Sequence, residues 1–207
     1  RRKILQLIKQ NILSKKKKSI DLLPSEQYIK SYKDLKHFFR FIFIMTADKL
    51  TSSWTLWFHS PTETSWDISS YQKIATVKTL EDFWDVYSRM TNPIVENGMF
   101  FLMRGDIQPI WEDPKNCDGG CWSFKIYKKY IPNTWLDLSV HTVAESLTRK
   151  GSESHLITGI SISPKKSFSI IKIWNNNSSK KENKLLTDKI THIQLNECLY
   201  KAHKGRQ

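Results

Sequence analysis

Glycine, cysteine and long apolar runs are all scarce in this chain of 207 residues. The seven glycines form neither a dinucleotide-binding fingerprint nor a phosphate-binding P-loop, and no Gly-x-Ser-x-Gly elbow occurs. The six histidines are scattered without metal-ligand spacing. These absences argue against the common enzyme classes that use such motifs. We therefore expect no catalytic residue, no cofactor and no metal ion.

The three cysteines are Cys117, Cys121 and Cys198. An odd number, outside any small cysteine-dense framework, is typical of a reducing compartment. We therefore expect a cytoplasmic protein. Cys117 and Cys121 are close enough in sequence to form half of a zinc site, but no Cys-x-x-Cys motif or pair of histidines completes four ligands.

The longest apolar run covers residues 38–45 and is interrupted by Arg40. A helix that crosses a membrane needs about 20 apolar residues. The run is much shorter than that, so the sequence predicts no membrane span.

Acidic residues are outnumbered, with 20 Asp and Glu against 33 Lys and Arg, and the formal net charge is +13. Residues 1–20 hold eight basic groups and no acid, and residues 180–207 hold seven basic groups and three acids, which leaves +1 for the residues between. We predict a flexible basic extension at 1–49 and a folded domain at 50–207. Basic tails attract polyanions such as RNA, or anionic surfaces, without specifying which.

Tryptophan, in contrast, is abundant, and all eight residues lie between Trp54 and Trp174. Trp66 follows the polar segment 60–65, and Trp111 lies in a loop flanked by prolines. Core tryptophans are seldom presented from such loops, so we expect these two indoles to be used for recognition. The tryptophans predicted to be structural are Trp54, Trp57, Trp122 and Trp135.

Strands and helices alternate irregularly along the chain, which favours an antiparallel α+β domain over a doubly wound parallel sheet. Strands are predicted at residues 54–58, 99–103, 121–127, 155–163 and 168–174, the last two forming a hairpin with a basic tip at 164–167. Three helices are predicted. The first is capped by Thr79 and ends at Asn92-Pro93, and the other two cover residues 134–147 and 187–201.

The loop residues suggest a site for one nucleotide base. Two indoles can stack on the two faces of a ring, and stacking is strengthened when the ring is cationic. The carboxylate of Glu112 only accepts hydrogen bonds, so it selects a base with adjacent N–H donors, such as guanine. A methylated, positively charged guanine meets both conditions. Glu112 and Asp113 could also be considered as an acid–base pair. No partner histidine lies nearby in the sequence, so this pair does not support a catalytic function.

Several segments, in order and at nearly the right spacing, resemble translation initiation factor 4E, the messenger RNA cap-binding protein. The resemblance covers about residues 50–203 and identifies a diverged member. It implies a curved antiparallel sheet, with three helices packed on the convex face and the cap bound on the concave face. The segments that carry it are Trp54–Phe58, Thr79–Trp84, Pro109–Asp113, Gly119–Trp122, Thr134–Asp137, Ile173-Trp174 and Thr191–Ile193.

By this resemblance, Trp66 and Trp111 sandwich 7-methylguanine, Glu112 binds its N1 and amino hydrogens, and Trp174 lies against the methyl group. Lys165, helped by Lys166, faces the triphosphate of the cap.

On the opposite surface, the resemblance implies that Trp84, flanked by Leu136 and Asp137, receives a helical peptide. That peptide contains Tyr, four residues, Leu and another apolar residue, and it comes from the scaffold factor 4G or from inhibitory binding proteins. The protein is expected to be a monomer that recruits the scaffold to start translation.

The sequence also departs from the family. Cys121 stands where a basic residue is usual near the phosphates, and Ile170 stands where a phosphate-binding lysine is expected, so the phosphate clamp is weakened or rebuilt. The chain stops at Gln207, directly after the last predicted helix, where the family continues into another strand, so we expect either that the sequence is truncated or that its sheet lacks the family's final strand. Two alternatives stay open: a diverged paralogue that binds a different cap or represses translation, and a general single-strand RNA-binding module.

Overall fold

Residues 49–203 are described by the structure, a computed structural model of the chain. Apart from Lys49, the predicted basic extension 1–49 lies outside the described residues.

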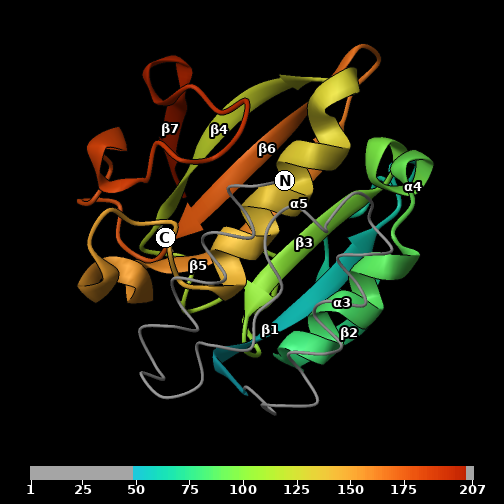
Figure 1. The fold of residues 1–207 in the computed structure, drawn as a ribbon, viewed down its shortest axis with the longest axis horizontal. Coiled ribbons are helices and arrows are strands. Elements are labelled where there is room, and N and C mark those ends of the chain that lie inside the picture. Colours follow the sequence, from blue (N-terminus) through green and yellow to red (C-terminus); the bar gives the residue numbers. More distant parts are fainter. Residues whose placement is uncertain (1–48, 204–207) are drawn as a thin grey trace, which may run out of the picture.

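Seven strands form one antiparallel sheet in the order β2-β1-β3-β5-β6-β4-β7 (Figure 1). The two central neighbours, β5 and β6, form the predicted hairpin, in which Ile160 pairs with Ile173. The strands are β1 (Lys49–His59), β2 (Tyr71–Thr79), β3 (Met99–Arg104), β4 (Gly120–Tyr127), β5 (Ile157–Pro164), β6 (Phe168–Asn175) and β7 (Leu199–Ala202).

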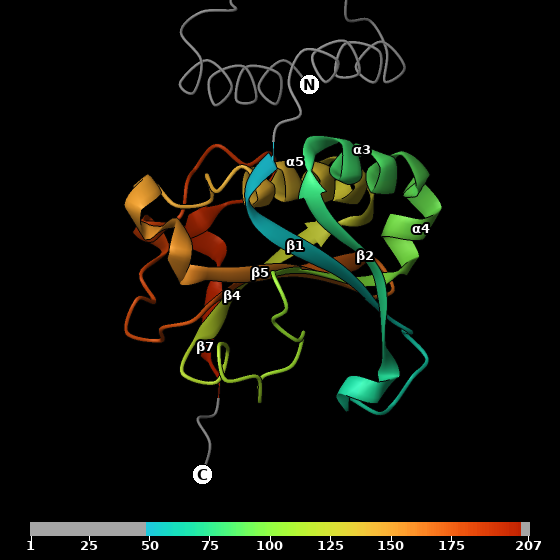
Figure 2. The same ribbon diagram turned by 90° about the horizontal axis from the view of Figure 1, so that it is seen from below.

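Three α-helices in the described part of the chain cover one face of the sheet, and the other face carries loops (Figure 2). They are α3 (Leu80–Arg89), α4 (Asn92–Asn97) and α5 (Ile131–Val143). The predicted arrangement of a curved antiparallel sheet with three helices on its convex face is confirmed. Asn92-Pro93 does not end the first helix directly: α3 stops at Arg89, and Pro93 lies in the first turn of α4, where its missing N–H costs nothing.

Apolar side chains are buried on both faces of the sheet. On β3, Phe100 and Leu102 join the large core under the helices, whereas Phe101 and Met103 join a second cluster on the opposite face. This alternation follows from the two-residue period of a strand. The second cluster forms the base of the loop-covered face.

A capping box starts α3. The Thr79 hydroxyl accepts a hydrogen bond from the Asp82 amide (3.1 Å), and the Asp82 carboxylate accepts one from the Thr79 amide (2.9 Å). Such reciprocal bonds satisfy two helix-end donors. The predicted helix start at Thr79 is therefore confirmed.

The predicted helix at 187–201 is wrong. The segment forms a 3-10 turn at Leu195–Glu197 and then strand β7, which pairs with β4. Two features prevent a helix here: the buried Asp137 carboxylate, on α5, binds the Thr191 amide (2.7 Å), and His192 has φ +64°. The exposed edge of β4 then provides backbone partners for Leu199–Ala202.

Candidate functional site

A cavity of about 420 Å³ opens on the face opposite the helices. The β1–β2 and β3–β4 connections, which project from the sheet on that face (Figure 2), contribute Trp66 and residues 109–112 to its lining. Four residues singled out in the sequence meet there, namely Trp66, Trp111, Glu112 and Trp174. The other lining residues are Tyr71, Phe101, Pro109, Ile110, Ser161, Ser163 and Lys172.

Trp66 is 57% exposed and is positioned by the turn before it. The Glu63 carboxylate accepts hydrogen bonds from the backbone amides of Thr64 (2.8 Å) and Ser65 (2.9 Å), and these bonds lower the pKa of Glu63. The imidazole Nε2 of His59, at the end of β1, lies 2.9 Å from the Ser65 carbonyl oxygen. The polar loop thus fixes an indole that has little apolar packing of its own.

Trp111 is 39% exposed, and the residues after it shape its loop. Asp113 accepts hydrogen bonds from the Gln108 and Lys115 amides (2.9 and 2.8 Å). The buried Asn116 amide donates to the Gln108 and Ile110 carbonyl oxygens (2.9 Å each). Asp113 is therefore committed to loop backbone, while its neighbour Glu112 lines the cavity.

Trp174 closes the base of the cavity and is only 2% exposed. Its Nε1–H donates to the Ser161 hydroxyl (2.9 Å), and its ring meets Phe101 edge-on at 6.3 Å. His203, on the far side of β4, lies 5.0 Å from the Trp174 ring centroid and donates through Nδ1 to the Asn116 carbonyl oxygen (2.7 Å). The base of the cavity is thus rigid and apolar.

Two titratable side chains close to Glu112 are kept neutral by burial. Burial, and after it the negative charge of Glu112, raise the pKa of Tyr71 to about 12. Burial lowers the pKa of His203, as does Lys172, although the Asn116 carbonyl and Glu112 act in the opposite direction. Near neutral pH, Tyr71 keeps its proton and His203 is uncharged.

Sequence reasoning placed the cationic residues differently. Lys165 and Lys166 lie at the exposed tip of the β5–β6 hairpin and do not line the cavity, whereas Lys172 does. Lys172 is two residues before Trp174, and on a strand that spacing puts both side chains on the same face. The two-residue period was the signal that could have found it. His59 and His203 carried no comparable signal in the sequence pattern; His203 reaches Trp111 only through the tertiary fold, and His59 reaches Trp66 through the fold of the β1–β2 connection.

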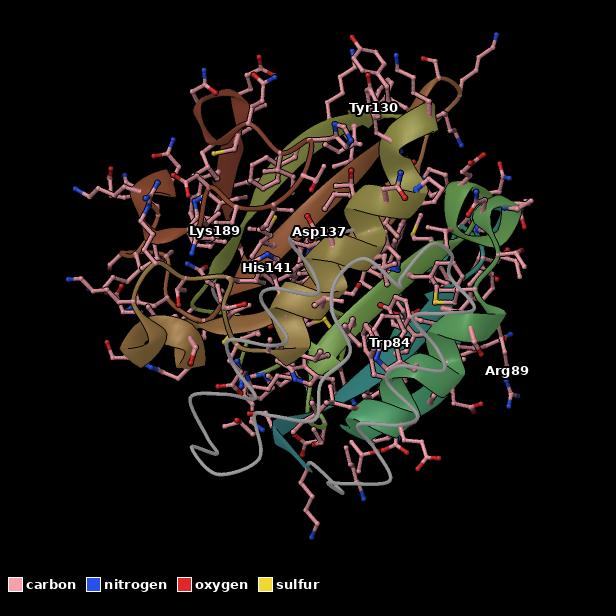
Figure 3. The ribbon with its side chains drawn as sticks, in the orientation of Figure 1. Trp84, Arg89, Tyr130, Asp137, His141 and Lys189 are labelled. Carbon is pink, nitrogen blue, oxygen red and sulfur yellow. The ribbon has the colours of Figure 1, made fainter. Side chains whose placement is uncertain are left out.

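The residues expected on the partner surface lie on the helix-covered face, with Trp84 on α3 and Asp137 on α5 (Figure 3). Trp84 and Leu136 are half-buried against the core. Asp137 is 4% exposed and its carboxylate binds the Thr191 amide, so the structure assigns it an internal contact in place of a surface role.

Residues 49–203 contain no group of three or more His, Cys, Asp or Glu side chains that could hold a metal ion, and the three cysteines are free thiols. None of their helices is long and apolar enough to cross a membrane.

A family model described as eukaryotic initiation factor 4E matches residues 49–207. The chain belongs to this family. A curated family relative, eukaryotic translation initiation factor 4E-2 of Schizosaccharomyces pombe, is 31% identical over 140 residues, which cover 64% of this chain and 56% of that protein. The chain therefore spans little more than half the length of this relative.

Two solved structures of the family share the fold. A schistosome eIF4E in complex with m7GpppG and 4E-BP has a TM-score of 0.59 and 26% identity, covering 66% of this chain and 76% of that one. Caenorhabditis elegans eIF4E-3, in complex with the 4E-binding protein Mextli and a cap analog, has a TM-score of 0.62 and 20% identity, covering 77% and 94%. Both are bound to a cap compound and to a binding protein.

Proposed function

We propose that this chain binds the 7-methylguanosine cap of messenger RNA in the cavity between Trp66 and Trp111. The observation that carries the proposal is the meeting of two exposed indoles and the Glu112 carboxylate at a single cavity. The indoles stack on a cationic purine from its two faces. Glu112 accepts hydrogen bonds from N1 and the exocyclic amine, and Trp174 lies against the methyl group.

We also propose that the chain acts in translation initiation, without catalysis, by recruiting a scaffold factor or a binding protein through Trp84 and Leu136. Family membership and the cap and binding-protein complexes of the schistosome and nematode relatives support this assignment. The cavity and the helix-covered face lie on opposite sides of the sheet, so one protein can hold the cap and a partner together.

Retention on immobilised 7-methyl-GTP tests the cap proposal. Trp66→Ala and Trp111→Ala should each abolish retention, whereas Tyr127→Ala, which removes another exposed ring outside the cavity, should not. Glu112→Gln replaces a charge-assisted acceptor, and a loss of about 1.5–3 kcal/mol, or roughly 10- to 150-fold in affinity, is expected. Circular dichroism should report the same fold for all variants.

Competition separates cap binding from general RNA binding. A cap reader is displaced from the resin by 7-methyl-GTP and poorly by GTP, because only the methylated base is cationic. Displacement by GTP, or by an uncapped single-stranded oligonucleotide, at equal concentration would favour the RNA-binding module and refute the cap proposal.

A further inference from the structure

Two lysines on neighbouring strands converge on the loop-covered face next to the cavity. Lys172 on β6 lines the cavity and pairs across the sheet with Ser161 on one side and Ser123 on the other. Lys201 on β7 pairs with Cys121. Cross-strand partners share a sheet face, so both ammonium groups rise on the side that carries Trp174.

The strand between the two lysines leaves room for them to approach one ligand. On this face β4 presents Cys121 and Ser123, which are both small, so no bulky side chain separates β6 from β7 there. The Cys121 thiol lies close to both cations: burial raises its pKa, while the charges of Lys172 and Lys201 act to lower it. The two ammonium groups therefore lie near the same small region of the sheet surface, around Cys121.

Both cations also lie against groups that hold the base. The Nζ of Lys201 is 5.5 Å from the centroid of the Trp111 ring. Lys172 is near enough to His203, which stacks beside Trp111, to contribute to lowering its pKa. Neither lysine forms an ion pair with any residue in the described part of the chain. An unpaired, half-buried ammonium such as Lys172 is expected to have an anionic partner in the working protein.

We propose that Lys172 and Lys201 together bind the 5′ phosphate chain of the nucleotide whose base occupies the cavity. This inference rests on the proposed cap-binding function and assigns its phosphate contacts to β6 and β7, away from the hairpin tip that holds Lys165 and Lys166. The phosphates leave the base at the Trp111 side, cross β4 over Cys121 and Ser123, and lie between the two ammonium groups. The hydroxyls of Ser161 and Ser163 provide further donors along the cavity wall.

The base itself gives this proposal a distinctive signature. 7-Methylguanosine without phosphate carries a positive charge, so Lys172 repels it, whereas the phosphorylated compounds are attracted. Lys172→Gln should therefore leave the affinity for the nucleoside unchanged or increase it, and should decrease the affinity for 7-methyl-GTP. A merely structural lysine would lower both affinities together.

Isothermal titration calorimetry with 7-methylguanosine and its 5′ mono-, di- and triphosphates tests the assignment on the full chain. For the wild type, affinity should rise with phosphate number. Lys172→Gln and Lys201→Gln should each reduce this increase of affinity with phosphate number, and the double variant should abolish it. Removal of each lysine should also lower the salt dependence of the binding constant by roughly one released counterion. Lys172→Arg and Lys201→Arg should retain the increase. Lys189→Gln, an exposed charge on the helix-covered face, is the matched control.

The competing site is the hairpin tip. A rise that persists in the double variant, or that disappears in Lys165→Gln with Lys172 and Lys201 intact, overturns the assignment while leaving cap binding in place. If the wild type binds none of the four methylated compounds, the proposed function itself fails and the assignment falls with it. Because Lys201 is exposed, Lys201→Gln keeps the test valid even if Lys172→Gln folds poorly.

Discussion

The imidazole of His59 and the indole of Trp66 lie parallel, with 4.6 Å between their ring centroids and 3° between their planes. His59 is fully buried, whereas Trp66 is largely exposed. On the other side of the cavity, His203 lies parallel to Trp111 at 6.0 Å and 7°. Each exposed indole is thus backed by a buried histidine ring, which holds it in place before any ligand arrives.

This backing leads to a prediction for His59. His59→Ala removes the stacked ring and the contacts of Nε2 with Ser65 and Ser70. An aromatic pair contributes about 0.5–1.5 kcal/mol, so the affinity for 7-methyl-GTP should fall about 2- to 13-fold with little change in secondary structure. His59→Phe restores the ring without the hydrogen bonds and should give an intermediate value. His155→Ala, at an exposed position, should have no effect in the same calorimetric titration.

The candidate site could be predicted in part from sequence alone. Trp66 and Trp111 were identifiable because each lies in a polar or proline-flanked loop, where core tryptophans are seldom found, and both are indeed exposed. Trp54, Trp122 and Trp135 were predicted to be structural and are buried. The supporting residues were not predictable. His203 is far from Trp111 in sequence and meets it only because β7 pairs with β4. His59 is close to Trp66 in sequence, but their stacking depends on how the connection after β1 folds back.

For the fold, too, features with local sequence signals could be predicted, and features set by long-range contacts could not. The five predicted strands and the helix with a capping box were found close to their predicted positions, since their signals are local. Strand β2 (Tyr71–Thr79) was not predicted. The helix predicted at 187–201 failed because the contacts that decide that segment are not local: Asp137 on α5 takes the Thr191 amide, and β4 offers an unpaired edge. The position of Lys201 beside Trp111 could not be predicted for a similar reason, because Lys201 reaches that ring only across the sheet.

A second prediction concerns the ion pair of Arg104 and Glu145 (2.7 Å), which joins β3 to the segment after α5. Arg104 also donates to Ser52 Oγ (2.6 Å) and lies 4.5 Å from the Trp54 ring centroid. Arg104→Met leaves a partly buried carboxylate with only the Ser52 and Ser154 hydroxyls as partners and should lower the free energy of unfolding by about 1.5–3 kcal/mol. Urea denaturation measures this loss.

The exposed pair of Arg149 and Asp188 (3.3 Å) provides the control, since Arg149→Met should cost about 0–1 kcal/mol. pH gives a further check. Burial opposes ionisation of Glu145, but hydrogen bonds from Ser52 and Arg104 outweigh it and lower the pKa of Glu145. A carboxyl group whose pKa is lower in the folded protein stabilises the fold at pH values above its pKa in the unfolded chain. The difference in free energy of unfolding between the wild type and Arg104→Met should therefore shrink as the pH falls below about 4.5. Equal losses for both arginine variants would contradict the assignment.

A third prediction concerns stability in mild acid. Burial lowers the pKa of both His141 and His203 in the folded protein. The unfolded chain, with histidine pKa values of about 6.5, then binds protons first as the pH falls, so the free energy of unfolding should decrease below that pH by at most about 1.4 kcal/mol per pH unit for each histidine. His141→Gln and His203→Gln should each flatten this decrease in urea titrations between pH 7 and 5. A decrease of unchanged steepness in both variants would show that other groups cause it.

The last prediction concerns Trp84 on the helix-covered face. Its indole is half-buried and meets Phe83 edge-on at 5.1 Å, so Trp84→Ala should cost some stability through lost packing. Because the cavity lies across the sheet, the same variant should abolish capture of a helical peptide with Tyr, four residues and two apolar anchors, yet keep its affinity for 7-methyl-GTP within about twofold. Arg89→Ala, on the same helix in an exposed pair with Asp85, controls for surface charge and should capture the peptide normally. If Trp84→Ala loses the cap and the peptide together, Trp84 acts through the core, and the partner surface must be sought elsewhere.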